Sequence, residues 1–242
     1  ALVFVVGKNF FAQYSQVLGS MALPASAFVF SLIATTLVYK LSSSFGKITV
    51  SVMILVGVAI NALAASCTGF LSYIARDPQA RSITFWNLGT FSGANWNSVM
   101  LVYAVTIPSI ILVLRYSKAL NALLLGESEA NYLGINTNAL KTKIILLNTF
   151  IVAIATSVVG VIGFVGLIVP HLLRMIKSSD NRFLIIGSTL IGAIIMNVAD
   201  MVSRVIIAPA ELPIGIVTSF VGAPVFIWLL LRQKGGKGGF YA

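Results

Sequence analysis

The chain has 242 residues, of which 58% are hydrophobic and 9% are charged, and its mean hydropathy is +1.00. A soluble domain carries about 25% charged residues, so this composition excludes a soluble protein and indicates an integral membrane protein. The formal net charge of +10 is spread over basic residues at the ends of apolar runs. Because these residues form no continuous patch, we predict no nucleic-acid partner.

Long uncharged runs predict an all-α fold of membrane-spanning helices, because a transmembrane barrel shows alternating segments of about ten residues. Seven complete spans are expected, in chain order at residues 21–40, 48–75, 97–114, 144–160, 161–176, 183–203 and 212–231. Residues 1–6 are too short to span a membrane, so we interpret them as the end of a helix that begins before this sequence. No polar loop marks the division at residues 160–166, and one bent helix or a re-entrant turn is the alternative there.

The positions of the basic residues predict the orientation of these spans. If the spans alternate, twelve of the 16 basic residues fall on one side of the membrane. The other side then holds the remaining four basic residues, which are Lys8, Arg76, Arg81 and Arg204. Because Lys and Arg favour cytoplasmic loops, we predict that the first side is cytoplasmic and the second is extracytoplasmic.

Few residues of the sequence are suited to catalysis or metal binding. One cysteine, Cys67, and one histidine, His171, exclude an intrachain disulfide and a His-rich metal site, so we expect no metal or cofactor held by this chain. We see no phosphate-binding GxxxxGKS/T motif and no nucleophile beside a base, and we expect no enzymatic activity. An ion-coupled transporter is an alternative class, but it requires acidic residues within spans, and only Asp200 qualifies.

The longest polar interval is residues 116–143, YSKALNALLLGESEANYLGINTNALKTK, which is predicted to be a cytosolic loop. Glycines at positions 126 and 134 interrupt its apolar pattern, so we expect two short helices joined at an angle. Glu127 and Glu129 suit the positive N-terminal end of the second helix. Two interpretations stay open: a solvated connector with ordinary capping, or a docking platform for a cytosolic partner.

This loop, GVIGFVGLIVPHLLRMI at 160–176 and NVADMVSRVIIAPAELPIGIVTSFVGAPVFIWLLL at 197–231 together resemble the permease subunits of ATP-driven iron-siderophore, haem and cobalamin importers, the FecCD-type family. The resemblance covers essentially the whole chain. It implies one permease domain over residues 1–242, within a ten-span fold that here lacks its first two helices and most of the third. It also implies a multi-pass protein of the bacterial cytoplasmic (inner) membrane.

The resemblance implies several partners. They are a second copy of the chain, two cytosolic ATPase subunits that bind ATP and Mg, an extracytoplasmic substrate-binding protein, and membrane lipid. The ATPase contact is placed on the coupling loop at Leu125, Gly126, Glu127, Ala130, Leu133 and Gly134. A rigid, shaped contact there would turn closure of the ATPases into movement of the permeases. For Glu127 the alternative is a helix cap.

A second motif of the resemblance, GFxGLxxPH, is matched by Gly163, Phe164, Gly166, Pro170 and His171. Its glycines are expected to permit close helix approach, and its proline to produce a bend. Because the predicted topology places His171 at the cytoplasmic end, we assign it a structural hydrogen bond and not a haem ligand.

Charged residues also occur on the predicted extracytoplasmic side. Asp200 and Arg204 share one helix face at a spacing of four residues and can pair, with Glu211 nearby. The resemblance implies that Arg204 docks acidic residues of the binding protein; the alternative is a pair that only anchors the helix end.

The other outer segment is a loop at residues 73–96, YIARDPQARSITFWNLGTFSGANW, in which Asp77-Pro78 predicts a turn. Its Arg76 and Arg81 would attract haem propionates or carboxylates of the binding protein. Its aromatic residues alone indicate an interfacial belt. As a set, the segment looks more like haem permeases, so haem is placed ahead of ferric siderophores, and cobalamin third.

A translocation path should be lined by small or weakly polar side chains, because a substrate that must leave cannot be held tightly. Such groups recur at roughly helical spacing on the predicted span 48–75. They are Asn61, Ser66, Thr68 and Ser72.

Overall fold

The computed structural model describes residues 1–5, 16–44, 47–48, 50–176 and 179–235, so Lys8 lies outside the described residues. Its helices are α1 (Leu2–Val5), α3 (Gln16–Ser42), α4 (Val50–Ile74), α5 (Asp77–Leu88), α6 (Trp96–Arg115), α7 (Ser117–Leu123), α8 (Glu127–Tyr132), α9 (Thr137–Val159), α10 (Val165–Ile176), α11 (Asn181–Ile206) and α12 (Ile214–Gly235). Within these residues, the only strands are β1 (Ser43–Ser44) and β2 (Lys47–Ile48), which pair antiparallel. The all-α prediction is confirmed.

Five of the described helices are long and apolar enough to cross a membrane, namely α3 from Leu23, α4, α6, α9 and α11. The chain is therefore a multi-pass membrane protein. Two shorter apolar helices, α10 and residues 214–229 of α12, occupy the other two predicted spans. The 12 residues of α10 rise only about 18 Å, whereas the hydrocarbon core of a bilayer is about 30 Å thick. The expected span at 161–176 is thus a shorter helix.

The division at residues 160–166 separates two helices and does not form one bent helix. Gly160 ends α9 with φ 79°, and its N–H donates to the carbonyl oxygen of Thr156. Phe164 has φ 66°, in the left-handed region that few residues other than glycine adopt. Helix α10 therefore begins only at Val165, because the backbone before it cannot continue a right-handed helix.

The chain forms two compact units, which are considered separately: residues 1–87 with 93–160, and residues 88–92 with 161–242. In the first unit, α9 packs against both α3 and α6, and α4 packs against α3. The hydroxyls of Tyr39 and Thr142 share a hydrogen bond of 2.9 Å, and the rings of Phe28 and Phe150 lie 5.9 Å apart. Ala153 of α9 is fully buried, so α9 is at the centre of this packing.

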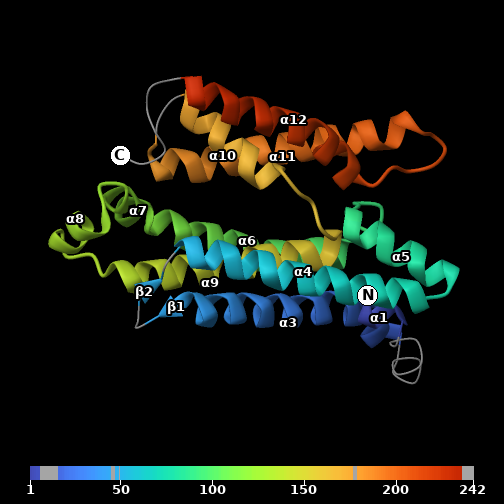
Figure 1. The fold of residues 1–242 in the computed structure, drawn as a ribbon. Coiled ribbons are helices and arrows are strands. Elements are labelled where there is room, and N and C mark those ends of the chain that lie inside the picture. Colours follow the sequence, from blue (N-terminus) through green and yellow to red (C-terminus); the bar gives the residue numbers. More distant parts are fainter. Residues whose placement is uncertain (6–15, 45–46, 49, 177–178, 236–242) are drawn as a thin grey trace. The chain divides into compact units, whose positions relative to one another are not determined.

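Within the first unit, the connections alternate between its two ends. Strands β1 and β2 lie at the same end as α7 and α8, whereas α5 lies at the opposite end (Figure 1). Spans that alternate in direction produce this arrangement. The predicted separation of the 116–143 loop from Arg76 and Arg81 therefore agrees with the structure of this unit.

In the second unit, α10 packs against α11 through Val169, Leu173 and Leu184. Helix α12 approaches α10 closely at Gly222, where an added Cβ would lie 2.7 Å from the Cβ of Phe164. Residues 88–92 contact the start of α12. The Ile214 N–H donates to the carbonyl oxygen of Gly89 at 3.0 Å, which satisfies one of the free donors of a helix N-terminus.

Candidate functional site

The predicted coupling loop is a folded helical hairpin and is shorter than expected. Helix α9 begins at Thr137, because the Asn136 side chain accepts a hydrogen bond from the N–H of Ala139 at 3.0 Å. The polar residues up to Lys143 are therefore already helical, and the connection between α6 and α9 consists of α7, α8 and their turns.

Two glycines define the ends of α8. Gly126 precedes the helix with φ 123°, a backbone conformation that side chains with a Cβ rarely adopt. Gly134 follows it with φ 81°, and its N–H donates to the carbonyl oxygen of Asn131. The next N–H, that of Ile135, donates to the carbonyl oxygen of Ala130, which completes a Schellman motif. The expected breaks at Gly126 and Gly134 thus lie where the hairpin turns.

The hairpin has a buried residue and a salt bridge to α9, together with an exposed apolar surface. Ala130 is fully buried, whereas Leu125 and Leu133 are 68% and 64% exposed. Glu127 forms a salt bridge with Lys141 of α9, and no side-chain cap hydrogen bond is made at the start of α8. This pair ties the first turn of α8 to the span that follows it.

The predicted turn at Asp77-Pro78 is wrong, since both residues lie in the first turn of α5. Proline is tolerated there because the first N–H groups of a helix have no partner inside it. Arg76 precedes the helix, and its N–H donates to the side-chain oxygen of Gln79 at 3.2 Å. This is the glutamine half of a capping box, a signal that the sequence contained and the prediction missed.

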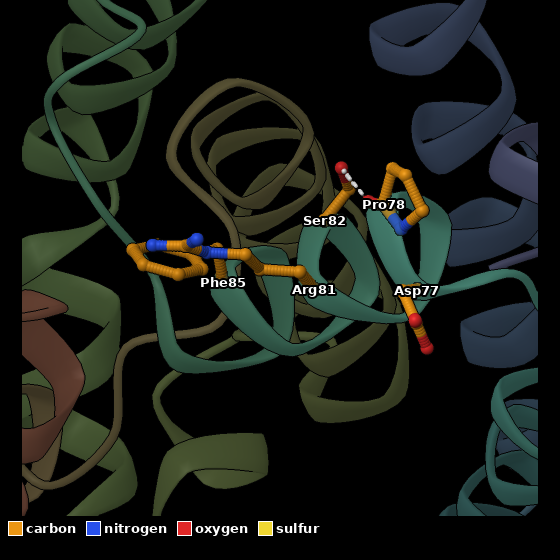
Figure 2. Close-up of a pocket in the computed structure, with 5 residues that line it drawn as sticks. All are labelled: Asp77, Pro78, Arg81, Ser82 and Phe85. Carbon is orange, nitrogen blue, oxygen red and sulfur yellow. Dashed lines mark hydrogen bonds between the residues drawn. The ribbon is translucent and has the colours of Figure 1, made fainter.

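Arg81 lies over an aromatic ring on the exposed side of α5. Its guanidinium carbon is 5.5 Å from the centre of the Phe85 ring, one helical turn further on. Figure 2 shows Arg81 extended toward Phe85, with Asp77 pointing away from it. Both residues line a shallow depression of about 560 Å³ together with Asp77, Pro78 and Ser82.

At the end of α11, in contrast, Arg204 lies beside two carboxylates. Its Nε lies 2.9 Å from Oδ2 of Asp200, and its Nη1 lies 3.9 Å from Oε1 of Glu211. The Asp200 side chain is only 22% exposed, whereas Arg204 and Glu211 are about half exposed. The predicted Asp200–Arg204 pair therefore forms.

The GFxGLxxPH residues lie at the start of the second unit's helices. Gly163 precedes α10, while Gly166, Pro170 and His171 lie within it. Among the described residues, an added Cβ at Gly163 or Gly166 would meet no atom within 4 Å. Within the described residues of the second unit, a close approach is made by Gly222 of α12 against Phe164.

The predicted path residues all lie on α4. Asn61 and Ser66 are exposed, and Thr68 and Ser72 are partly buried. The Ser66 hydroxyl donates to the carbonyl oxygen of Ala62 at 2.9 Å, so its polarity is largely satisfied by its own helix. No residue in the most apolar window of α4 is buried in the described structure. Their role in a path stays a prediction.

Sequence reasoning overlooked the Arg81–Phe85 contact and the Glu127–Lys141 salt bridge. The first had a local signal, because residues four apart on a helix are neighbours. The second joins residues 14 positions apart, and only the folded hairpin reveals it. In the described part of the chain, no group of three or more His, Cys, Asp or Glu residues is placed to hold a metal ion.

Comparison with known proteins identifies the family of this chain. A model of the FecCD transport family matches residues 1–232. The chain belongs to the FecCD transport family. Hemin transport system permease protein HmuU of Yersinia pestis is 40% identical to this FecCD chain over 228 residues, 94% of the chain and 66% of the relative. Vitamin B12 import system permease protein BtuC of Vibrio cholerae is 35% identical over 234 residues, 96% of the chain and 69% of the relative.

A solved structure described as an inward-facing metal-chelate type ABC transporter has a similar fold. It superposes with a TM-score of 0.71 at 32% sequence identity, covering 89% of this FecCD chain and 65% of the solved chain. The chain thus spans 65–69% of the length of these three relatives. The family resemblance predicted from the sequence motifs is confirmed.

Proposed function

We propose that this chain is the membrane-spanning permease subunit of an ATP-driven importer of haem or another iron chelate in the bacterial cytoplasmic membrane. A ferric siderophore is the second candidate substrate, and cobalamin is the third. Residues 1–242 act as one permease domain that works with a second copy of itself. The chain supplies no catalytic residue and no cofactor, because ATP and Mg²⁺ bind to two partner ATPase subunits.

The α7–α8 hairpin carries this proposal. Exposed leucines on a loop outside the apolar spans indicate a surface that binds another protein. The two glycine turns define the ends of α8, and the Glu127–Lys141 salt bridge joins α8 to α9. A hairpin between two spans, α6 and α9, can transmit movement of a bound ATPase to the membrane helices.

The order of substrates follows the outer loop and the relatives. The relative named for hemin transport is 40% identical, and the relative named for vitamin B12 import is 35% identical. Arg76, just before α5, and Arg81, within it, are both exposed and cationic, which suits an anionic substrate or partner. We assign docking of an extracytoplasmic binding protein to Arg76, Arg81 and Arg204, and the path to Asn61, Ser66, Thr68 and Ser72.

A reconstituted complex tests the assignment. The chain would be placed in liposomes with an ATPase subunit and a binding protein of a haem importer, and ATP hydrolysis measured as haem, a ferric siderophore or cobalamin is added. Stimulation by haem alone is expected. Stimulation by another of these ligands would identify that ligand as the substrate and leave the importer assignment intact. Failure to associate with any such ATPase would contradict the importer assignment.

Variants of the hairpin make the test specific. Leu125→Ala and Leu133→Ala should each weaken ATPase association by about tenfold, because truncation of an apolar anchor in an interface costs more than about 1 kcal/mol. Ser128→Ala, at an exposed position of α8 between the two leucines, is the matched control and should bind normally. Equal binding by all three variants would exclude the hairpin as the coupling surface.

A further inference from the structure

Four exposed basic residues lie at the end of the first unit that carries α7 and α8. Lys40 is in the last turn of α3, Arg115 ends α6, Lys118 is the second residue of α7, and Lys143 is in the second turn of α9. Figure 1 shows the end of α3, the end of α6 and the start of α9 at this end of the unit. The fold therefore brings together cations from separate parts of the sequence.

Lys40 and Lys143 lie on the same side of the α3–α9 pair. The hydroxyls of Tyr39 and Thr142 share a hydrogen bond of 2.9 Å, so these two residues face each other across antiparallel helices (Figure 1). Each residue of a helix is rotated by about 100° from the residue before it. Because the two helices run in opposite directions, the residues that follow a facing pair are turned toward the same side. Lys40 and Lys143 are those residues.

Lys143 also connects this side of the pair to the end of α6. Its Nζ lies 5.7 Å from the centre of the Tyr116 ring, within the range of a cation–π contact. Tyr116 directly follows Arg115 and precedes α7, where Lys118 lies. Lys40, Arg115, Lys118 and Lys143 therefore form one group, the basic cluster.

Few carboxylates of the first unit can neutralise the basic cluster. The sequence of this unit contains three acidic residues, Asp77, Glu127 and Glu129. Asp77 lies in α5 at the opposite end, Glu127 pairs with Lys141, and the Glu129 carboxylate lies against Gly126 of its own hairpin. No salt bridge between described residues involves a member of the basic cluster. This end of the unit therefore keeps an excess of positive charge.

The lengths of the spans place the basic cluster at the level of lipid headgroups. The 20 residues of α6 rise about 30 Å, which matches the hydrocarbon core of a bilayer and puts Arg115 at its edge. The apolar segment Leu23–Ser42 of α3 has the same length and ends two residues after Lys40. Tyr39 and Tyr116 lie beside these cations, and tyrosine is enriched at the membrane–water interface.

We propose that the basic cluster binds the phosphate headgroup of an anionic phospholipid, in the leaflet on the side of the α7–α8 hairpin. Arg115 binds phosphate oxygens through its planar fork, and the three lysines act as point charges around them. A headgroup held between α3, α6 and α9 ties the base of the hairpin to the membrane surface. This inference goes beyond the proposed function, because it requires only that these helices span a membrane.

An acidic protein surface is the alternative partner, and the position of the basic cluster fits it less well. The exposed Leu125 and Leu133 lie on the hairpin itself, outside the spans, where a soluble protein can reach them. The basic cluster lies instead where the apolar spans end. Lipid headgroups border every span at that level, and basic residues there are attracted to anionic lipids.

Phospholipid binding to the purified chain in detergent, measured by native mass spectrometry, tests the proposal. The probes are phosphatidylglycerol and phosphatidylcholine with identical acyl chains, so that only the headgroup and its net charge differ. Glycerol phosphate, which has the anionic group without acyl chains, is the competitor. We expect phosphatidylglycerol to bind at least about tenfold more tightly than phosphatidylcholine. Glycerol phosphate should not displace it at equal concentration.

Variants separate the basic cluster from net charge. Lys143→Gln and Arg115→Gln should each weaken phosphatidylglycerol binding by about fivefold and leave phosphatidylcholine binding unchanged, because each basic residue near a membrane surface contributes a similar share. Lys143→Arg keeps the charge and should retain the preference. Arg81→Gln removes one exposed charge at the opposite end of the unit and is the matched control. The substituted residues are exposed, so the variants are expected to fold, which thermal unfolding would verify.

Three results would overturn the proposal. The first is equal binding of the two lipids, and the second is an equal loss of preference in Arg81→Gln and Lys143→Gln. The third is displacement by glycerol phosphate at equal concentration, which would indicate a site for a soluble phosphate. If Lys143→Gln weakens only association with an ATPase subunit, the basic cluster docks a protein. A preference for phosphatidylglycerol in a chain that binds no ATPase would support the basic cluster while the importer assignment fails.

Discussion

Two aspartate–arginine pairs with the same spacing behave differently in this protein. Asp77 and Arg81 lie four residues apart on α5, and Asp200 and Arg204 lie four residues apart on α11. The second pair forms a salt bridge of 2.9 Å, whereas the first does not form. Helical spacing therefore makes an ion pair possible, but neighbouring groups decide whether it forms.

Competing partners explain the difference. Arg81 has Phe85 one turn further along α5, and an exposed salt bridge with Asp77 would be worth little more than the cation–π contact with this ring. Asp77 lies at the start of α5, where the helix dipole already favours its negative charge. Arg204 has a second carboxylate nearby, Glu211, and its partner Asp200 is mostly shielded from solvent.

The largest expected effect on stability comes from Arg204→Ala. This change leaves Asp200 and Glu211 without a cation, and an unpaired, poorly solvated carboxylate is destabilising. We expect the Tm in nanodiscs to fall by on the order of 4 °C. Arg81→Ala should lower the Tm by less than about 1 °C, because exposed charged side chains contribute little to stability. An equal fall in Tm in the two variants would contradict the difference between the Arg204 and Arg81 sites.

Glu211→Gln should have a smaller effect. Its Oε1 lies 3.9 Å from Arg204 Nη1, beyond hydrogen-bonding distance, and both side chains are about half exposed. The Tm should fall by about 1 °C at low salt, and the loss should disappear near 1 M salt, where the screening length is about 3 Å. Asp200→Asn serves as the comparison, and its loss should persist at high salt because Asp200 is shielded.

Phe85→Leu should create the ion pair that α5 lacks. Without the ring, Arg81 can turn toward Asp77, and a helical pair of this spacing is worth about 0.3–0.5 kcal/mol. Thermal unfolding of Asp77→Asn and Arg81→Gln, singly and together in the Phe85→Leu background, would measure the coupling. A coupling near zero in that background would show that Phe85 is not what prevents pairing.

Asp77→Asn and Arg81→Gln, singly and together with Phe85 retained, should give the smallest coupling. Here the changes in Tm from Asp77→Asn and Arg81→Gln should add, since the two side chains do not contact each other. The Asp200→Asn and Arg204→Gln pair, measured in parallel, should deviate clearly from additivity. Coupling of similar size at both sites would contradict the structure of α5.

Much of the fold could be predicted from the sequence, because long uncharged runs, their lengths and the bordering basic residues follow from the membrane as a solvent. The hairpin of α7 and α8 was also predictable, since Gly126 and Gly134 permit backbone angles that other residues avoid. Helix α5 was missed because Asp77-Pro78 suits a turn and a helix start equally well. The capping contact of Gln79 decides between them.

The sequence by itself determined the all-α membrane class, the family, and which arginines have an aspartate within reach. Only the tertiary structure decided that Glu127 reaches Lys141 and that α12 approaches Phe164 at Gly222. The reason is that periodicity describes neighbours along one helix, whereas these contacts join separate elements. Their strength depends on solvent exposure and competing groups, which no local pattern contains.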